Sequence, residues 1–537
     1  MTRGRSGGTR PPGATGPPHK GLVLGICSLS LFMIYLDSTV LNVALPTIQR
    51  DLHSGLSGLQ WVVDAYMLVL ASLLMLSGSI GDRFGRRRVF RLGLLTFSAS
   101  SLLCSLAPNL GTLIAFRVLQ AAGGSLLTPA SLSIVRNTFT DPSERARAIG
   151  LWSAVFGLAA ACGPILGGML VGLLGWRSIF FVNVPLGVAA FIVAGRFLPE
   201  SRAPYPRRFD PLGQLLILVA LASLTYAIIQ GPATGYTSPQ ILALFTLGGV
   251  SLAAFLAVER RQPEPLLELR FFRSPPFSGA VAIAVLSFVV LAGFLFVNTL
   301  YLQEVRGDSP LWAGLSTLPA TGMIALSAPI AGRLTARRGP GLPMTIAGAS
   351  LAVGAAMLVA ITATISYLWL AAAYLLVGLG SGLINPPITD TAVSGMPPAQ
   401  AGVASAVTSA SRQLGNVIGV AVMGAMLTTG FRAALLARLA SLHLDAATRA
   451  QLLHAGAGGA SMSGALRANP AVQAAIDQAF SAATHGPWIL ASVCGAACAV
   501  VALATTHSRA RATARTVYRD AEREPALSGA SADSTPR

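Results

Sequence analysis

The sequence predicts an all-α membrane protein with fourteen transmembrane helices, and three observations lead to this fold class. Of the 537 residues, 53% are hydrophobic and only 11% are charged, whereas a soluble domain carries about 25% charged residues. The mean hydropathy is +0.65. The apolar residues gather into segments near or above the length of about 20 residues that spans a bilayer as a helix.

Each expected span is an apolar segment of this kind, and short polar loops separate most of the spans. A helix rises about 1.5 Å per residue, so segments of this length can cross the hydrocarbon core. In chain order, the expected spans are 21–45, 59–80, 91–107, 111–135, 147–173, 177–198, 211–230, 239–258, 277–302, 311–331, 341–363, 366–388, 401–429 and 486–506.

The basic residues are distributed unevenly between the two sides that fourteen spans create. Both tails and the loops on their side carry 29 of the 38 basic residues. An excess of arginine and lysine marks the cytoplasmic side of a membrane protein. Both termini are therefore predicted to be cytoplasmic, in a multi-pass protein of the cytoplasmic (inner) membrane. The net charge of +18 reflects this topology, and we expect no nucleic-acid partner.

A weak internal repeat divides the chain into two halves. The segment G-R-L-T-A-R-R-G at 332–339 matches residues 78–85, with Ala336 in the place of Asp82. Membrane proteins built from internal repeats show such partly preserved copies. Any latch that uses the acid is therefore expected in the N-terminal half only.

Two bundles of six spans leave one pair over, and polar stretches on both sides of this pair mark it as an insert between the halves. The predicted organisation is a disordered cytoplasmic tail at 1–20, an N-terminal six-helix bundle at 21–200, two inserted transmembrane helices at 201–262, a C-terminal six-helix bundle at 263–506, and a second cytoplasmic tail at 507–537.

The longest loop, residues 430–485, is expected on the outer side. Phe431 and four leucines after it share one helical stripe, and Asn469 followed by Pro470 is typical of a helix start. We expect two short amphipathic helices that lie at the membrane interface, and a movable lid is the alternative.

Several function classes are excluded or disfavoured. All five cysteines lie within expected spans and no histidine has metal-ligand spacing, so we expect neither a metal site nor a cofactor. The only lysine is Lys20, so a phosphate-binding G-x-x-x-x-G-K-[ST] loop cannot exist in this chain. The loops offer no acid pair of the D-x-D kind, and we expect no enzymatic activity.

Away from the span ends, four charged residues lie within expected spans, namely Asp37, Asp64, Arg117 and Arg412. A charge inside a bilayer costs several kcal/mol, so such residues are functional candidates. Residue counts place Asp37, Asp64 and Arg117 roughly 14, 6 and 9 Å below the outer surface. A nearby arginine sets the proton affinity of a carboxylate, so moving it can couple substrate to proton. The alternative is a static ion pair that holds helices together.

Four sequence strings carry a resemblance to a known family. They resemble the loop, span-1, span-4 and span-5 motifs of the major facilitator superfamily, and fourteen spans resemble its drug:proton antiporter branch with fourteen transmembrane helices. The strings are G-S-I-G-D-R-F-G-R-R-R at 78–88, L-D-S-T-V-L-N-V-A-L-P at 36–46, R-V-L-Q-A-A-G-G at 117–124 and C-G-P-I-L-G-G at 162–168.

The resemblance implies the major facilitator fold, two six-helix bundles with two extra transmembrane helices inserted between them. It also implies a functional role for Asp37, a helix-shaping role for Pro46 and a part in proton transfer for Arg117. Gln120 matches the span-4 motif, whereas Ala121 replaces its first glycine.

Three further strings are similar to the fourteen-span branch. The last of them places Arg412 near the middle of its span. The strings are W-R-S-I-F-F-V-N-V-P-L-G at 176–187, Q-E-V-R-G-D-S-P-L-W-A-G at 303–314 and S-R-Q-L-G-N-V-I-G-V-A at 411–421.

Two of the motifs predict mechanical roles. Residues of the charged hairpin are expected to bridge helix ends on the cytoplasmic face in one conformer and to separate in the other, although some arginines there serve topology alone. The span-5 string is of the antiporter type, with a helix-bending proline and glycines that permit close packing. The predicted latch is Gly78, Asp82, Arg83, Gly85 and Arg86, and the antiporter-type helix motif is Gly163, Pro164, Gly167 and Gly168.

These features favour a proton-coupled antiporter that exports small amphiphilic drugs, dyes or antibiotics by alternating access. Proton-coupled uptake, or facilitated transport by the same fold, is the alternative. We expect a monomer in the lipid bilayer whose partners are protons and the substrate. The expected proton-coupling residues are Asp37, Arg117 and Asp64, and the expected substrate cavity consists of Trp61, Tyr66, Gln120, Asn298, Tyr301 and Arg412.

Overall fold

The computed structural model describes residues 20–202, 210–262, 269–393, 401–439 and 470–506. Within these ranges the chain is almost entirely helical and contains no strand, which confirms the predicted all-α class. The predictions of disordered tails concern residues outside these ranges, apart from Lys20, which begins the first helix.

The helices of the N-terminal half and of the insert follow one another with short connections. Their bounds are α1 Lys20–Asp51, α2 Leu56–Phe84, α3 Arg86–Ser105, α4 Leu110–Thr138, α5 Pro142–Leu174, α6 Ser178–Phe181, α7 Asn183–Phe197, α8 Pro211–Thr234 and α9 Pro239–Glu259.

The C-terminal half begins with a short 3-10 helix and includes one π-helical turn. Its elements are η1 Leu269–Arg273, α10 Pro275–Leu300, the π-helix η2 Tyr301–Val305, α11 Pro310–Ser316, α12 Leu318–Arg338, α13 Gly341–Val359, α14 Tyr367–Val393, α15 Ala401–Leu439 and α18 Pro470–Thr505.

The described helices coincide with the fourteen predicted spans. Eleven are long and apolar enough to cross a membrane, and thirteen are when each of two bent pairs counts as one span. The remaining predicted span corresponds to α3, which begins with the basic sequence R-R-R-V-F-R. Outward-facing apolar side chains such as Leu95, Ile192 and Val250 are exposed, as contact with lipid requires.

The bend in α5 has an identifiable cause. The helix changes direction by 42° between Ala160 and Cys162, and Pro164 lies four residues after Ala160. The ring of a proline inside a helix clashes with the carbonyl group four residues earlier and removes a hydrogen bond. The span-5 proline therefore shapes this helix as the sequence predicts.

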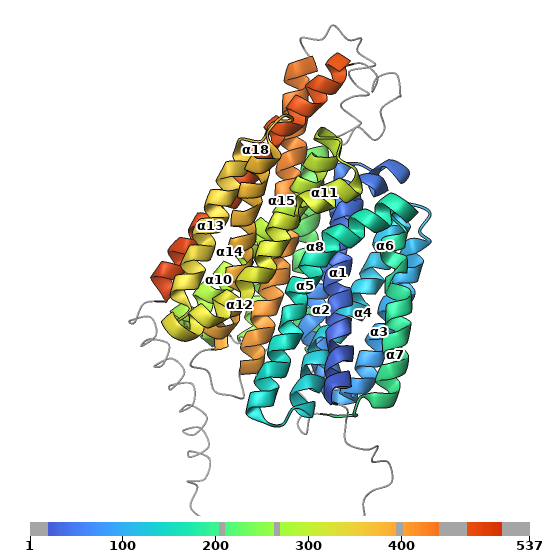
Figure 1. Cartoon of the computed structure of the whole chain (residues 1–537), viewed down its shortest axis with the longest axis vertical. Helices are drawn as coiled ribbons and strands as arrows, with labels where there is room; N and C mark the ends of the chain where they lie inside the picture. The colour runs from blue at the N-terminus through green and yellow to red at the C-terminus, as the bar shows by residue number, and fades with distance from the viewer. Residues whose placement is uncertain (1–19, 203–209, 263–268, 394–400, 440–469, 507–537) are drawn as a thin grey trace, which may run out of the picture.

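The two halves pack by the same scheme, which supports the internal repeat. In the N-terminal half α1 packs on α5, α2 on α4, and α3 on α4 and α7. The corresponding pairs in the C-terminal half are α10 on α15, α12 on α14, and α13 on α14 and α18. Figure 1 shows the halves side by side, with α1–α7 in one bundle and α10–α18 in the other.

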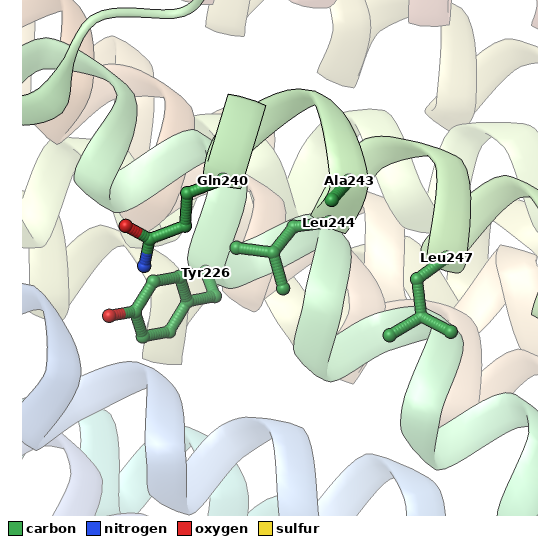
Figure 2. A pocket seen from close by; sticks show the side chains of 5 residues that line it. All are labelled: Tyr226, Gln240, Ala243, Leu244 and Leu247. Carbon is green, nitrogen blue, oxygen red and sulfur yellow. The ribbon is translucent and has the colours of Figure 1, made fainter. Parts of the chain in front are cut away.

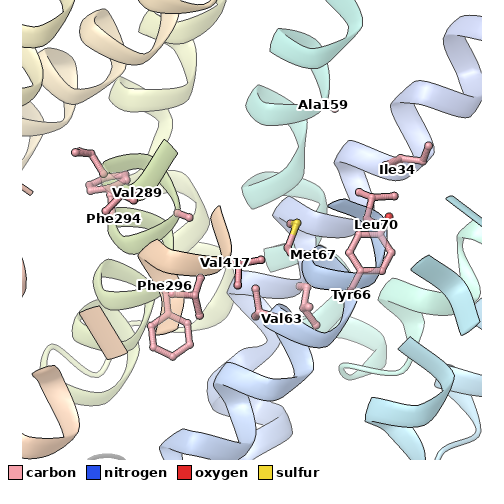
Figure 3. Close-up of a cluster of buried hydrophobic side chains, with 14 of the residues drawn as sticks. Ile34, Val63, Tyr66, Met67, Leu70, Ala159, Val289, Phe294, Phe296 and Val417 are labelled. Carbon is pink, nitrogen blue, oxygen red and sulfur yellow. The ribbon is translucent and has the colours of Figure 1, made fainter. Parts of the chain in front are cut away.

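The contacts between the halves are also formed by equivalent helices of the two repeats. Helix α2 packs on α15, and α5 packs on α12, so each half offers its second and its fifth helix to the other. Buried apolar side chains from both halves belong to one core. Figure 3 shows part of it, including Val63 and Met67 on α2, Val289 and Phe296 on α10, and Val417 on α15.

The inserted helices lie at the junction of the halves. Helix α8 packs against both α2 and α15, and α9 packs against α8. The ring of Tyr226 on α8 lies 5.5 Å from that of Trp61 on α2. Tyr226 also lines an open pocket of about 300 Å³ together with Gln240 and three apolar residues of α9 (Figure 2). The insert therefore covers the seam beside α2.

The described parts of the region 430–485 belong to two long helices and do not form separate short ones. Helix α15 continues to Leu439, and α18 begins at Pro470, the helix start that the sequence predicts. The two helices contact each other through Phe431 and Phe480, whose ring centroids are 6.2 Å apart, and extend beyond the rest of the bundle (Figure 1). The apolar stripe pairs with a second helix and so lengthens the span. Residues 440–469 lie outside the described ranges.

The start of α1 and the end of α18 lie at one end of the bundle (Figure 1), which we call the terminal end. The opposite end, where α1 finishes, we call the far end. There the halves are joined by side-chain amides. Gln60 on α2 donates hydrogen bonds to the main-chain oxygens of Val420 (3.1 Å) and Ala421 (3.0 Å) on α15.

A second amide and two glycines complete the far-end contact. Gln303 donates a hydrogen bond to the main-chain oxygen of Val43 (2.9 Å). A Cβ atom at Gly168 would lie 2.6 Å from the oxygen of Pro310, and one at Gly314 would overlap the oxygen of Pro164. The close approach of α5 and α11 therefore depends on glycine on both sides, and the far end is closed.

We expect Gly314→Val to open the far end, because the added side chain would occupy the position of the α5 backbone. Spin labels attached to cysteines at the exposed residues Leu174 and Trp312 should move apart by several ångströms in electron–electron distance measurements. Gly322→Val is the control, because a Cβ at Gly322 has no neighbour within 4 Å. Equal distances in the two variants would show that Gly314 does not determine closure.

Candidate functional site

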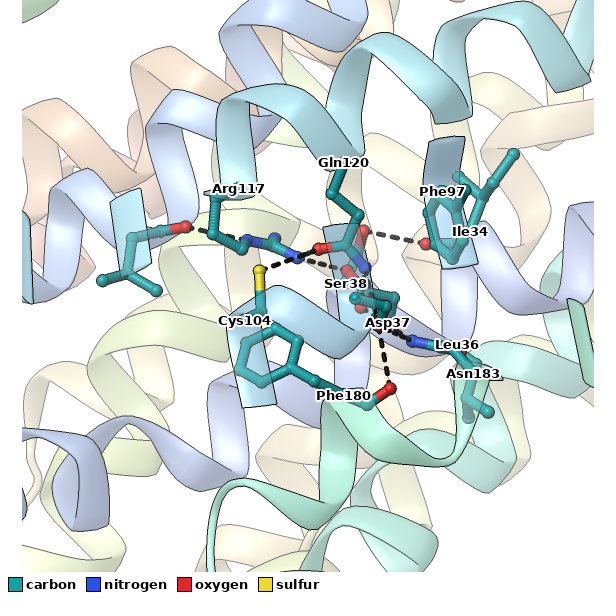
Figure 4. Close-up of polar contacts among 12 residues, drawn as sticks. Ile34, Leu36, Asp37, Ser38, Phe97, Cys104, Arg117, Gln120, Phe180 and Asn183 are labelled. Atoms are coloured by element: carbon teal, nitrogen blue, oxygen red, sulfur yellow. Dashed lines mark hydrogen bonds and ion pairs between the residues drawn. The ribbon is translucent and has the colours of Figure 1, made fainter. Parts of the chain in front are cut away.

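A fully buried cluster of polar side chains lies inside the N-terminal bundle (Figure 4). Asp37 comes from α1, Arg117 and Gln120 from α4, and Asn183 from the start of α7. Arg117 and Gln120 are three residues apart, so they project from the same face of α4. The start of α4 is fixed by a capping box between Asn109 and Thr112.

The carboxylate of Asp37 is the acceptor at the centre of this cluster. One oxygen accepts hydrogen bonds from the amides of Gln120 (2.8 Å) and Asn183 (3.0 Å). The other forms a short ion pair with the guanidinium of Arg117. Ser101 on α3 accepts from both amides at 3.2 Å, so four helices meet around one carboxylate.

The guanidinium of Arg117 is held on several sides. It donates to the oxygen of Gln120 (2.9 Å) and to the main-chain oxygen of Val62 (3.2 Å). It stacks on the ring of Tyr66 at 4.0 Å and lies 5.7 Å from that of Phe180. Its second terminal nitrogen, Nη2, is buried and has no hydrogen-bond partner in the described part of the chain.

The Asp37–Arg117 pair is sealed from solvent. The side chains are 1% and 0% exposed. Opposite charges at contact in a low-dielectric interior attract strongly, and removing either one leaves the other uncompensated. A proton can therefore reach Asp37 only if Arg117 and the two amides move, so a change in protonation must accompany a change in helix packing.

The sequence predicted three members of this cluster and missed the others. Asp37, Arg117 and Gln120 lie together as the depth estimate and the motifs indicated. Asn183 and Ser101 were not singled out. Asn183 lies within the string at 176–187 and is a polar residue in an apolar span, a signal that could have identified it. Ser101 offered no such signal, because serines are frequent in membrane helices.

Asp64 does not join the cluster. It is 0% exposed, and neither carboxylate oxygen has a hydrogen-bond partner among the described residues. It lies four residues after Gln60, and therefore on the same face of α2, the face that contacts α15. Asp64 thus lies beside the seam between the halves, away from Arg117.

The residues predicted to line a substrate cavity are dispersed. Trp61 contacts the inserted helix α8 through Tyr226. Asn298 accepts a hydrogen bond from Tyr374, and Tyr301 donates one to the main chain of Thr362 (2.7 Å), so both form contacts inside the C-terminal bundle. Gln120 belongs to the buried cluster, and Tyr66 packs on its Arg117. Arg412 lies on α15 and donates a hydrogen bond to Thr389 of α14.

The charged hairpin is a compact unit at the terminal end. Asp82 accepts two hydrogen bonds from Arg86, at 2.7 and 3.1 Å, and Gly85 has a φ of 107°, which suits glycine. Glu200 at the end of the bundle accepts from the main chain of Arg87 (3.2 Å) and lies 3.8 Å from its side chain. The sequence did not indicate Glu200. Gly78 packs near Pro129 on α4.

The span-5 glycines serve helix packing. A Cβ atom at Gly163 would overlap the hydroxyl of Thr39, and one at Gly167 would lie 3.1 Å from the main-chain oxygen of Val40. Both positions bring α5 close to α1, directly above the turn that carries Asp37. Within the described residues no group of three or more His, Cys, Asp or Glu side chains could hold a metal ion.

Comparison with known proteins gives a consistent family assignment. The Major Facilitator Superfamily profile matches residues 27–420. A Mycobacterium tuberculosis protein named "Multidrug resistance protein Stp" is 39% identical over 77% of this chain and 77% of its own length. The "Tetracenomycin C resistance and export protein" of Streptomyces glaucescens is 37% identical over 78% of this chain and 79% of its own.

Solved structures agree on the fold. A bacterial homologue of the human lysosomal transporter Spinster, in an inward-facing and occupied conformation, superposes with a TM-score of 0.66. The identity is 16%, and the match covers 93% of this chain and 99% of that one. A peptide transporter POT gives a TM-score of 0.58 at 15% identity, over 94% and 96% of the two chains.

We expect Asp37→Asn to lower the free energy of unfolding by about 3–5 kcal/mol, because it leaves Arg117 as an unpaired buried charge. The double variant Asp37→Asn/Arg117→Gln removes both charges and should recover most of that loss. Thermal unfolding of the purified protein in detergent measures both effects. Asp390→Asn, at an exposed carboxylate of α14, is the control and should unfold like the parent protein.

Proposed function

Because the chain belongs to the major facilitator superfamily, we propose that it exports small amphiphilic compounds, including drugs or antibiotics, in exchange for protons. The observation that carries the proposal is the sealed Asp37–Arg117 pair at the meeting point of α1, α3, α4 and α7. The names of the relatives, a multidrug resistance protein and a resistance and export protein, support export over uptake.

The orientation follows from the charges. The terminal end carries the arginine-rich hairpin, and the sequence assigns 29 of the 38 basic residues to the tails and loops of that side, so we assign it to the cytoplasm. Both termini are then cytoplasmic and the far end faces outward. The proposed location is the cytoplasmic membrane, in which the protein acts as a monomer and performs no enzymatic reaction.

The structure then corresponds to an inward-facing state. The hydrogen bonds between the halves, from Gln60 and Gln303, lie at the outer end. At the inner end Asp82 pairs with Arg86 of its own hairpin and Glu200 holds the next arginines. In the outward-facing state we expect Asp82 to exchange its partner and to bridge the halves, in the manner of a latch.

Proton coupling is assigned to Asp37 and Arg117, with Asp64 as a second site. When Asp37 takes a proton, Arg117 loses its counterion, and the packing of α1 on α4 must change. Asp64 is buried and accepts no hydrogen bond from the residues that the structure describes, so it requires either a proton or a new partner when the seam between α2 and α15 moves. Both carboxylates thus link protonation to alternating access.

We expect Asp37→Asn to abolish proton-linked export, and the double variant Asp37→Asn/Arg117→Gln to remain inactive although its stability recovers. The reason is that neither variant retains a group at position 37 that exchanges a proton. Dye efflux measured in energised vesicles, at matched protein amounts, provides the readout. Asp390→Asn should export like the parent protein. Parental efflux by the double variant would reduce the pair to a structural support.

We expect export to follow the proton gradient and not ATP. Efflux from loaded vesicles should collapse with a protonophore and persist without ATP while respiration maintains the gradient. In proteoliposomes with an imposed pH step, outward movement of substrate should accompany inward movement of protons. Inward movement of both would establish uptake, and indifference to the pH step would establish facilitated transport.

A further inference from the structure

Arg412 is the one intramembrane arginine left without a counterion in the described residues. Its terminal nitrogen donates a hydrogen bond to the hydroxyl of Thr389 on α14 (2.6 Å), but its Nε is buried and has no partner there. The ion pairs of the described chain do not include it. Arg117, the other arginine inside a span, has Asp37 as its counterion.

The surroundings of Arg412 are aromatic and come from both halves. Arg412 lies one turn before Gly415 on α15, where an added Cβ atom would lie 2.9 Å from the Cβ atom of Phe288 on α10. The ring of Tyr35 packs edge-on against Phe156 of α5, with centroids 4.7 Å apart. Phe156 in turn lies 6.4 Å from Phe288 of α10. Tyr35 and Phe156 are only partly buried.

A second hydrogen-bond donor without a described acceptor lies on α5, close to Phe156 in the sequence. The indole nitrogen of Trp152 is buried and has no acceptor among the described residues. Trp152 is four residues before Phe156, so it shares that residue's face of α5. A buried donor that lacks an acceptor among the described residues therefore lies one turn from Phe156, whose ring lies between those of Tyr35 on α1 and Phe288 on α10.

An arginine inside a membrane span destabilises the protein unless an anion compensates its charge. Residue counting places Arg412 roughly 16 Å along α15 from Ala401, inside the span. The free-energy cost of an uncompensated charge is several times larger there than at the surface. The missing counterion can be supplied by a ligand. A carboxylate or phenolate accepts charge-assisted hydrogen bonds from arginine, and aromatic faces hold a planar apolar body.

We propose that the substrates bound between the halves are acidic aromatic amphiphiles, whose anionic group is held by Arg412 and whose ring lies against Tyr35 and Phe156. This assignment rests on the proposed export function, because it names the substrate class of the same transport pathway. Thr389 orients the guanidinium, and the indole N–H of Trp152 is available to a second oxygen of the ligand.

The test compares three fluorescent probes that share one aromatic body and differ in charge. Dansyl-phenylalanine carries a carboxylate, dansyl-phenylalaninamide is neutral, and dansylcadaverine is a cation. Binding to the purified full-length protein in lipid nanodiscs is followed by the dansyl fluorescence. We expect the acid to bind about tenfold tighter than the amide, or more, and the cation to bind weakest.

Variants identify the residues that cause the preference for the acidic probe. Arg412→Gln should remove the preference for the acid and leave the affinity for the amide within about twofold. Trp152→Phe keeps a ring, removes the N–H and should weaken only the acid, by a smaller factor. Arg432→Gln, at an exposed arginine of the same helix, is the matched control and should bind all three probes like the parent. Size-exclusion profiles verify that each variant is folded.

The outcomes separate the substrate class from the transport function. Equal binding of acid and amide by the parent protein, or an unchanged preference in a folded Arg412→Gln variant, would overturn the proposal. If the proton gradient drives export of the amide or the cation and the acid is not preferred, the export function is confirmed and the proposed acidic substrate class is wrong. If the gradient moves none of the probes, the export function fails, and the binding comparison still decides the substrate class.

Discussion

The constraint on which the site depends is that a charge inside the bilayer must be compensated. Asp37 and Arg117 meet this requirement for each other, and no solvent reaches either side chain. The amides of Gln120 and Asn183 occupy the remaining acceptor positions of the carboxylate. Because these groups come from α1, α4 and α7, one ion pair fixes the relative positions of three helices. Close packing of α5 through Gly163 and Gly167 then completes the bundle.

The duplicated fold carries charges that are not duplicated. Helix packing is equivalent in the two halves, yet among the described residues a buried pair of acid and arginine occurs in the N-terminal half only. The C-terminal half contributes Arg412, whose described partner is a hydroxyl. Ala336 likewise replaces the hairpin acid. In the proposed mechanism, equivalent packing would let the halves rock against each other, and the unequal charges would divide the two proposed tasks, proton exchange in one half and anion binding in the other.

Sequence patterns predicted what depends on lipid and on single charges. The spans, the insert and the association of Asp37 with Arg117 follow from hydropathy, because apolar length and isolated charges are visible residue by residue. Contacts between polar groups that are far apart in the sequence could not be predicted in this way. Asn298 and Tyr301 looked like cavity residues, but their hydrogen bonds to Tyr374 and Thr362 depend on how α10 and α14 pack. The long extensions of α15 and α18 escaped notice because a stripe that suits a membrane surface equally suits a helix partner.

The proposed coupling follows from the same balance of charges. If Asp37 is protonated, the guanidinium of Arg117 keeps its ring contact with Tyr66 but loses its anion, and a buried unpaired charge costs several kcal/mol. If an acidic ligand leaves Arg412, a second buried cation is uncovered. Both losses are relieved by opening the bundle to water. Protonation from outside and departure of the ligand therefore favour rearrangement of the same seam, where α2, α15 and α8 meet, and the exchange of ligand for proton requires no further signal.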